Sequence, residues 1–266
     1  MHPMLAIAIQ AARQAGRLIS RAYYQGKISQ IDSKGNNDFV SEVDRQSEAT
    51  IIELLQRSFP EHSILAEESG HHQGKSDYEW VIDPLDGTTN FLHNNPQFAV
   101  SIALRQQGRT ELGVIYDPLR DELFTTLRGK GAFLNDRRIR VGNLTGLPGA
   151  LLGTGFPFKT PHYLETYLST FSALFPQVSD VRRAGAASLD LAYIAAGRLD
   201  GFWEIGLREW DIAAGALMIQ EAGGLVSDFA GGHNFLISGN VVAGNPRLLK
   251  GILQTINPLL PPELLK

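Results

Sequence analysis

The segment Asp83-Pro84-Leu85-Asp86-Gly87-Thr88-Thr89-Asn90 brings together two carboxylates, a glycine and two hydroxyls. Carboxylate oxygens are the ligands of a hard cation such as Mg2+, which is commonly held by a few carboxylates and by a phosphate of the substrate. Gly87 lets the backbone approach a ligand closely, and a short helix beginning at 87–89 would direct free N–H groups at an anion. The segment therefore suggests a cation site that opens onto a phosphate site.

A plain turn explains the same residues equally well. Asp-Pro and Asp-Gly are ordinary turn pairs, and a strand that ends in a turn needs no metal. We expect Trp80-Val81-Ile82 to form a buried strand with Asp83 at its end, and Pro84 to stop regular pairing. Other acidic residues must decide between the two interpretations.

Length and composition narrow the classes of protein that this chain can belong to. The 266 residues suit a single α/β domain of 1–266, with an N-terminal half of about 1–145 packed against a C-terminal half of about 146–266. The chain has no cysteine, which excludes disulfides, thiolate metal sites and cysteine nucleophiles. The net charge is −4, and the basic run 137–140 is more typical of a solvated strand edge than of a nucleic-acid footprint. We therefore expect no direct nucleic-acid binding.

Hydrophobic patterning predicts an alternation of helices and strands. Residues 1–24 have apolar side chains at helical spacing interrupted by arginines, which favours an amphipathic helix over a signal peptide. No run is long enough to cross a membrane, so we expect a cytoplasmic protein. The polar segment 32–38 is expected to be irregular because it is rich in glycine and asparagine. Further helices are predicted at 44–59, 163–175, 188–197, 211–222 and 246–256, and strands at 63–66, 79–82, 98–105, 112–116, 122–127, after 133, and at 150–153, 181–184, 199–204, 225–227 and 240–243.

More carboxylates fall at the edges of these predicted elements. Glu67 and Glu68 follow the strand at 63–66, and Asp44 and Asp211 begin helices. A helix-initial aspartate is more often an N-cap than a ligand, and the capping interpretation stays open for Asp44 and Asp211. Together with Asp83 and Asp86, however, these residues could supply a two-metal site.

At this point the sequence resembles the inositol monophosphatase family, and within it the bacterial extragenic-suppressor subgroup, over essentially its whole length. The resemblance rests on Ala66-Glu67-Glu68-Ser69, on Trp80 to Phe91, and on Trp210-Asp211-Ile212-Ala213-Ala214-Gly215, with Glu221-Ala222-Gly223-Gly224 in support. It implies a layered αβαβα sandwich of the inositol monophosphatase and fructose-1,6-bisphosphatase type. It also implies two or three Mg2+ ions and a homodimer.

The resemblance assigns roles to individual residues. Glu67, Asp83 and the carbonyl of Leu85 would hold one Mg2+, and Asp83, Asp86 and Asp211 a second. Glu68 would help to hold a third, weaker ion through water. Thr88 would lie beside the attacking water, oriented by Asp44, and Glu67 would help to position that water. The phosphate would be bound by the N–H groups of Gly87 and Thr88. The alcohol portion would be bound by Gly185, Ala187 and Glu204, with Asp86 and Asp211 sharing in this.

The reaction implied by the resemblance is hydrolysis of a phosphate monoester by metal-activated water, without a phosphoenzyme. The leading substrate is inositol 1-phosphate, and lithium inhibition is expected. Fructose-1,6-bisphosphatase and nucleotide 3'-phosphatase activities are alternatives, because they share the metal motif. An alternative of another class is a protein-binding factor in RNA polymerase antitermination at ribosomal RNA operons, with contacts to polymerase or Nus factors.

Three weaker signals have less support from their patterns. His71-His72 is expected to be solvated in a polar loop, and Gly153-Thr154-Gly155-Phe156-Pro157 lacks the rest of a nucleotide-binding motif and is expected to be a bend. Its place in the family lies near the substrate, but it offers no clear equivalent of a serine found there. A lysine of the family approaches the phosphate, and Lys34 matches it only with shifted spacing.

Overall fold

The computed structural model describes residues 2–26, 31–35 and 38–265, with side chains described for 2–26 and 41–265. Its helices are α1 (Pro3–Gln25), α2 (Glu42–Ser58), α3 (Thr88–Leu92), α4 (Leu164–Leu174), α5 (Ala187–Ala195), α6 (Glu209–Glu221), α7 (Phe235–Ser238) and α8 (Pro246–Ile256). Its strands are β1 (Ile31–Gly35), β2 (Asp38–Ser41), β3 (Ser63–Ala66), β4 (Gly70–His72), β5 (Tyr78–Asp86), β6 (Ala99–Gln106), β7 (Arg109–Asp117), β8 (Glu122–Leu127), β9 (Gly131–Leu134), β10 (Arg137–Arg138), β11 (Leu151–Thr154), β12 (Asp180–Arg182), β13 (Gly201–Glu204), β14 (Leu225–Ser227) and β15 (Val241–Gly244). Short 3-10 turns cover Pro161–Tyr163, Phe175–Gln177, Asn257–Leu259 and Pro262–Leu265.

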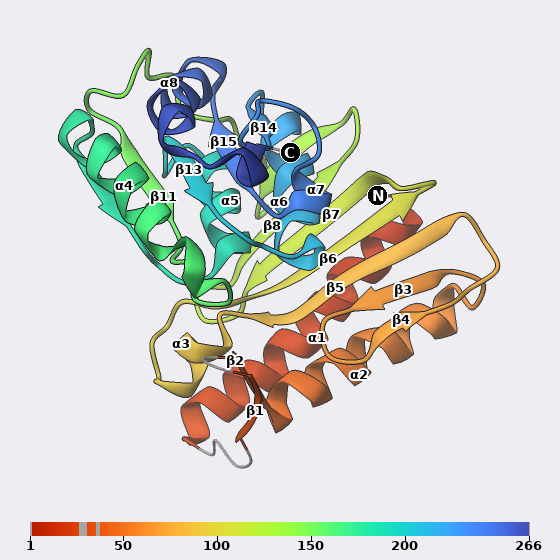
Figure 1. Cartoon of the computed structure of the whole chain (residues 1–266). Coiled ribbons are helices and arrows are strands. Elements are labelled where there is room, and N and C mark those ends of the chain that lie inside the picture. The colour runs from red at the N-terminus through yellow and green to blue at the C-terminus, as the bar shows by residue number, and fades with distance from the viewer. Residues whose placement is uncertain (1, 27–30, 36–37, 266) are drawn as a thin grey trace.

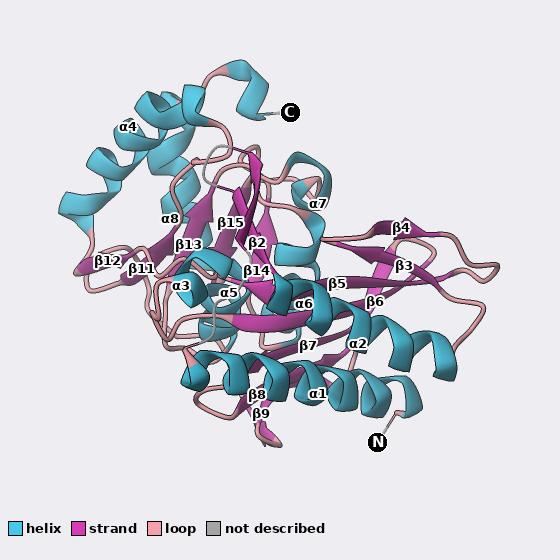
Figure 2. Ribbon diagram, turned by 90° about the horizontal axis from the view of Figure 1, so that it is seen from below, coloured by secondary structure: helices cyan, strands magenta, loops and turns pink. Residues whose placement is uncertain are grey.

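The elements form five layers, as the fold class predicted (Figure 1). Helices α1 and α2 cover one face of an eight-stranded sheet of order β10-β9-β8-β7-β6-β5-β3-β4. Helices α5 and α6 lie between that sheet and a five-stranded sheet of order β12-β11-β13-β15-β14. Helices α4 and α8 cover the far side of the second sheet, and Figure 2 shows α1 and α2 side by side beneath the first.

The alternation of side chains along β5 explains why both faces of its sheet are covered. Successive residues of a strand point to opposite faces. Val81 belongs to the core shared with α5 and α6, whereas Trp80 and Ile82 belong to the core shared with α1 and α2. All three side chains are at most 1% exposed. A strand buried on both sides thus carries the chain to Asp83, as expected.

Pro84 interrupts the regular pairing of β5, as expected, but it does not end the strand. Strand β5 continues to Asp86, with Asp83 opposite Ser101 and Asp86 opposite Ala99 across a bulge. A bulge accommodates proline because the ladder is already interrupted there. The bulge leaves Asp83 and Asp86 at one end of a central strand.

Two further expectations need correction. The segment 32–38 was expected to be irregular, but its described residues lie in β1 and β2, which pair antiparallel. His71 and His72 lie in β4 rather than in a loop, where His71 Nε2 is 3.2 Å from Glu79 Oε1 and His72 Nε2 is 2.6 Å from Ser69 Oγ. In both places, backbone pairing with a neighbouring strand outweighs the polar composition. The side chain of Lys34 lies outside the described residues.

Among the described residues, no helix combines the length and the apolar character that crossing a membrane requires.

Candidate active site

The acidic residues singled out by their spacing converge at one end of the eight-stranded sheet. Strand β3 runs parallel to β5 with Ala66 beside Ile82, so Glu67, which follows the end of β3, lies next to Asp83 in β5. The N–H of Glu67 donates to the carbonyl of Ile82 at 3.1 Å, which keeps the two chains in register past the end of β3. Asp211 enters from the first turn of α6 in the middle layer.

Carboxylate oxygens of Asp83, Asp86 and Asp211 all lie within 4.8 Å of one another. Asp83 is 1% and Asp86 is 9% exposed, and Glu67 lines the same cavity. Like charges this close inside a protein repel strongly unless a cation or protons neutralise them. Oxygen donors in this arrangement therefore fit a divalent metal ion.

The pKa values of these carboxyl groups reflect both burial and mutual repulsion. Burial raises the pKa of Asp83 well above its usual value, and the charges of Glu67, Asp86 and Asp211 raise it further. Burial also raises the pKa of Asp86 to about 6, although hydrogen bonds from Ser188 oppose the change. Burial and then the Asp86 charge raise the pKa of Asp211 to about 6. In the absence of a cation, burial and repulsion thus favour the protonated, neutral forms of these carboxyl groups.

Thr88 and Asp44 meet beside this cluster, as expected. The Thr88 Oγ1 lies 2.9 Å from Asp44 Oδ1 and 3.1 Å from the carbonyl oxygen of Leu85. The Leu85 N–H in turn donates to Asp83 Oδ1 at 3.0 Å. One hydroxyl therefore connects α2 with the end of β5 that carries the acidic cluster.

Capping and a site role coexist at Asp44 and Asp211. Helix α2 has Ser41 as its N-cap, and Asp44 Oδ2 accepts the Ser41 N–H at 2.9 Å in a capping box. Asp211 Oδ2 accepts the N–H of Arg208 at 2.7 Å in the first turn of α6. The second oxygen of Asp44 is the one that faces Thr88. Each helix start thus fixes its carboxyl group in one orientation.

Gly87 and Gly185 face each other where the two halves of the chain meet. Both have left-handed backbone conformations, with φ of 96° and 88°. A Cβ on Gly87 would lie 2.8 Å from the carbonyl oxygen of Gln97 and 3.3 Å from that of Gly185, so only glycine fits there. Helix α3 starts immediately after Gly87, as expected.

The remaining expected residues line the same cavity of about 490 Å³. Its walls include Gly185, Ala187 and Glu204 from the C-terminal half. Glu204 is 8% exposed, and burial followed by the charge of Asp190 raises its pKa well above the usual value. The residues that the sequence proposed for catalysis, substrate or metal line this cavity, with two exceptions: Asp44 reaches it through Thr88, and Glu68 lines a separate hollow beside α2.

Sequence reasoning missed two residues that hold the site together. Ser188 donates its N–H and its hydroxyl to Asp86 Oδ2, at 2.7 and 2.5 Å. Glu48, 3% exposed and one turn after Asp44 on α2, accepts the N–H groups of Glu68 and Ser69, both at 2.8 Å. Neither had a local signal beyond its position, because the partners lie far along the chain.

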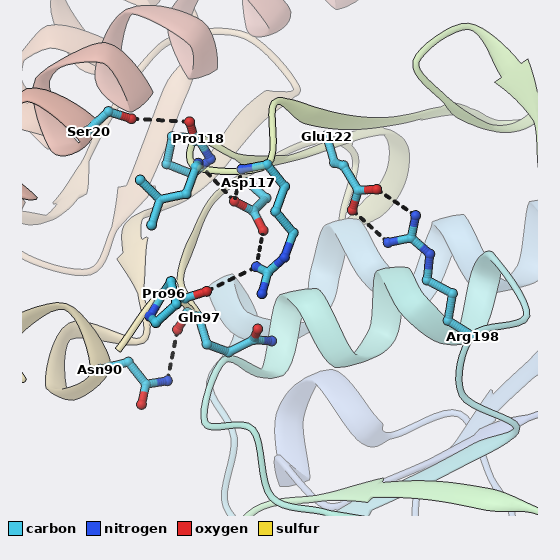
Figure 3. A network of polar contacts seen from close by, with 10 residues as sticks. Ser20, Asn90, Pro96, Gln97, Asp117, Pro118, Glu122 and Arg198 are labelled. Carbon is cyan, nitrogen blue, oxygen red and sulfur yellow. Dashed lines mark hydrogen bonds and ion pairs between the residues drawn. The ribbon is translucent and has the colours of Figure 1, made fainter. Parts of the chain in front are cut away.

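Asn90 was part of the quoted motif but was assigned no role. Its Nδ2 donates to the carbonyls of Gln97 at 2.8 Å, Ala184 at 2.9 Å and Gly185 at 3.2 Å. Figure 3 shows Asn90 pointing at Gln97, beside the carbonyl of Pro96, which accepts from Arg120. One amide thereby ties α3 to the segment that leads into α5.

Comparison with known proteins agrees with this geometry. The sequence model of the Inositol monophosphatase family matches residues 1–260. The chain is 56% identical over 254 residues to a protein named Nus factor SuhB from Escherichia coli (strain K12), covering 95% of each chain. The crystal structure of the extragenic suppressor protein suhB from Bartonella henselae is similar with a TM-score of 0.92 and 45% identity, covering 95% of this chain and 98% of that one.

A third similarity extends beyond the proteins named as suppressors. The structure of the inositol monophosphatase from Anabaena (Nostoc) sp. PCC 7120 matches with a TM-score of 0.84 and 38% identity, over 97% of this chain and 96% of that one. The sequence match, the layered fold and the acidic cluster all point to one assignment. The chain belongs to the inositol monophosphatase family.

Proposed function

We propose that this protein is a Mg2+-dependent phosphate monoester hydrolase and that inositol 1-phosphate is its preferred substrate. The observation that carries the proposal is the convergence of Asp83, Asp86 and Asp211 within 4.8 Å in a cavity that Glu67 and Thr88 also line. Family membership supports a metal-dependent phosphatase. The named inositol monophosphatase among the similar structures supports the choice of substrate.

In this proposal Glu67, Asp83, the carbonyl of Leu85, Asp86 and Asp211 are the metal ligands. Bound divalent cations would lower the pKa of a coordinated water and neutralise the charge that develops on the leaving oxygen. The remaining side chains and N–H groups of the site would then position the water and the substrate. All of these proposed ligand atoms are carboxylate or carbonyl oxygens, which favours Mg2+ over a transition metal.

Thr88 and Asp44 would orient the attacking water. Asp44 is buried, and its Oδ1 accepts a hydrogen bond from the Thr88 hydroxyl, which leaves a Thr88 lone pair to accept a hydrogen bond from the water; a proton leaving the water would pass to Thr88 as the Thr88 proton passes to Asp44. Glu67 would accept a second hydrogen bond from the same water. The N–H groups of Gly87 and Thr88 would bind phosphate oxygens, while Gly185, Ala187 and Glu204 would bind the alcohol. Positioning and electrostatics then supply most of the barrier reduction.

Replacement of Asp83 by Asn tests the proposal. The variant should lose nearly all Mg2+-dependent release of phosphate from inositol 1-phosphate while its far-UV circular dichroism is unchanged. Retention of more than a tenth of the wild-type rate would rule out the assigned metal site. Comparison of kcat/KM for inositol 1-phosphate, fructose 1,6-bisphosphate and a nucleoside 3'-phosphate separates the three candidate substrates, and inhibition by Li+ at tens of millimolar is expected.

A second function is favoured by the names of the relatives. The E. coli protein and the Pseudomonas aeruginosa protein, which is 55% identical over 269 residues, are both called Nus factor SuhB. We propose that this chain also binds the RNA polymerase antitermination machinery, in the cytoplasm and through protein contacts. Pull-down from cell extract with the Asp83→Asn variant should still recover polymerase or Nus factors. Failure of both wild type and variant to do so would contradict this role.

We also propose a homodimer, as in the resemblance stated above. Large hydrophobic side chains are exposed between residues 156 and 175, including Leu164, Leu168 and Phe175. Exposed apolar side chains gathered in one segment are typical of an interaction surface. Light scattering during size-exclusion chromatography would give a mass near 58 kDa, twice the 29.2 kDa of the chain, and a monomer mass would contradict the proposal.

A further inference from the structure

The segment Gly153-Thr154-Gly155, which was expected to be a bend, forms part of the floor of the cavity. Gly153 lies in β11 and Gly155 follows it, so the two glycines share one face of the strand. A Cβ on Gly155 would lie 2.0 Å from Glu204 Oε1, and a Cβ on Gly153 would lie 3.6 Å from Asp190 Cγ. Gly155 thus leaves room for the Glu204 carboxyl group, whereas a side chain at Gly153 would meet Leu199 and Phe202 before it met Asp190.

Asp190 has the features of a binding group without its ligand. It comes from α5 and is 2% exposed, and it lines the same cavity as Glu204. The other buried acids of the site have donors: Asp86 has Ser188, and Asp44 has Ser41 and Thr88. Among the described residues, the hydrogen bonds include none to the carboxyl oxygens of Asp190 or Glu204. The oxygens of Asp190 and Glu204 are not among the fully enclosed polar atoms that lack a partner, and both residues line the cavity, where hydroxyl groups of a ligand could donate to them.

The charges around this pair favour hydroxyl donors over a second phosphate. Arg183 acts electrostatically on both carboxyl groups, and its guanidinium lies over the ring of Phe156, 5.2 Å from the ring centre. Asp86 and Asp211 add further negative charge from the metal side. A dianionic phosphate placed here would meet several carboxyl groups and two cations of the cavity wall, Lys159 and Arg183, whereas hydroxyl groups can donate to both acids and add no charge.

We propose that Asp190, a residue with no role assigned above, determines specificity together with Glu204 by accepting hydrogen bonds from hydroxyl groups of the alcohol portion. The inference rests on the proposed phosphatase function. It predicts selection of polyhydroxylated alcohols over simple aryl esters and over substrates with a second phosphate at this end of the cavity. The absence of a side chain at Gly155 is then what gives the Glu204 carboxyl group its space.

The test compares two substrates at saturating Mg2+ for each variant. Inositol 1-phosphate offers hydroxyl donors, and p-nitrophenyl phosphate offers none. Asp190→Asn should raise KM for inositol 1-phosphate by about tenfold or more, the usual effect of weakening a hydrogen bond to a charged group, and change kcat/KM for p-nitrophenyl phosphate by no more than about twofold. Asp228→Asn is the matched control, because Asp228 is a buried aspartate that does not line the cavity.

A second variant keeps the inference testable if Asp190→Asn folds poorly. Gly155→Ala should displace the Glu204 carboxyl group and produce the same selective loss of inositol 1-phosphate. Equal losses on both substrates would overturn the inference and indicate that Asp190 only supports Arg183 or the fold. Absence of Mg2+-dependent turnover of either substrate by the wild type would instead refute the proposed function.

Discussion

Removing one charge from the acidic cluster should stabilise the metal-free protein while abolishing its activity. Asp83 is 1% exposed, and its oxygens lie within 4.8 Å of those of Asp86 and Asp211. At that distance each like-charge pair repels by about 3 kcal/mol for an effective dielectric constant of about 20. Because Asp83→Asn removes this repulsion but also replaces a charged acceptor of the Leu85 N–H by a neutral one, we expect the metal-free variant to gain about 2 kcal/mol in stability at pH 7.5, roughly 4–8 °C in Tm.

The gain should depend on pH in a direction that the pKa values set. Asp86 and Asp211 have pKa values of about 6 in the folded chain, above the value of 3.8 for an unperturbed aspartate. Groups with raised pKa values favour the folded state when protonated, so metal-free wild type loses stability as the pH rises from about 4 through about 6. At pH 4.5 both neighbours are largely protonated, and the advantage of Asp83→Asn should nearly vanish.

Urea unfolding in EDTA at pH 7.5 and pH 4.5 measures this effect. Asp228→Asn is again the control, since Asp228 accepts the N–H groups of Gly232 and Asn234 rather than facing other carboxylates, and it should be destabilised at both pH values. The reasoning is refuted if Asp83→Asn is no more stable than wild type at pH 7.5 without metal. Addition of Mg2+ should reverse the order at pH 7.5, because only the wild type retains its full set of ligands.

Three further substitutions test the supporting contacts. Thr88→Ala should lower kcat by about a hundredfold or more with little change in the Mg2+ concentration needed for half-maximal rate, since it removes the hydroxyl that binds Asp44 and, in the proposed mechanism, orients the attacking water. Glu48→Gln should raise the Mg2+ concentration needed for half-maximal rate severalfold, because it weakens the hydrogen bonds that hold the turn after Glu67. Glu53→Gln, at an exposed position of the same helix, is the control. Unchanged Mg2+ activation in Glu48→Gln would contradict the role of Glu48. Asn90→Ala should raise KM for inositol 1-phosphate, because the Gly185 segment loses its tie to α3, and an effect on kcat alone would count against this.

Most of the fold could be predicted because the patterns that produce it are local. The apolar run ending at Ile82 identified a buried strand, and the paired glycines 223–224 marked the end of α6 within one residue. The β1–β2 hairpin was missed because turn-forming residues such as Gly35 also occur in irregular loops, and backbone pairing has no side-chain signature. The bulge at Pro84 was missed for the same reason.

The candidate site also contains residues that a local pattern identified and contacts that no local pattern could identify. Glu67, Asp83, Asp86 and Asp211 could be proposed because each sits at the end of a predictable element. The support from Ser188 to Asp86 joins residues 102 positions apart, and no local pattern indicates such a contact. The packing of Glu204 on Gly155 is likewise visible only in three dimensions, although it explains why a glycine occupies that position.

During translation, the first sheet is synthesised before the middle layer of helices that covers it. Strands β5 to β8 emerge within the first 127 residues, but the helices that cover their second face, α5 and α6, span 187–221. A nascent chain therefore completes an apolar sheet surface, including Val81, Ala103 and Ile115, well before its cover is synthesised. Such a surface is prone to aggregation during translation. Asp211 arrives with that same cover, so the last of the proposed metal ligands is delivered by the helix that closes the core.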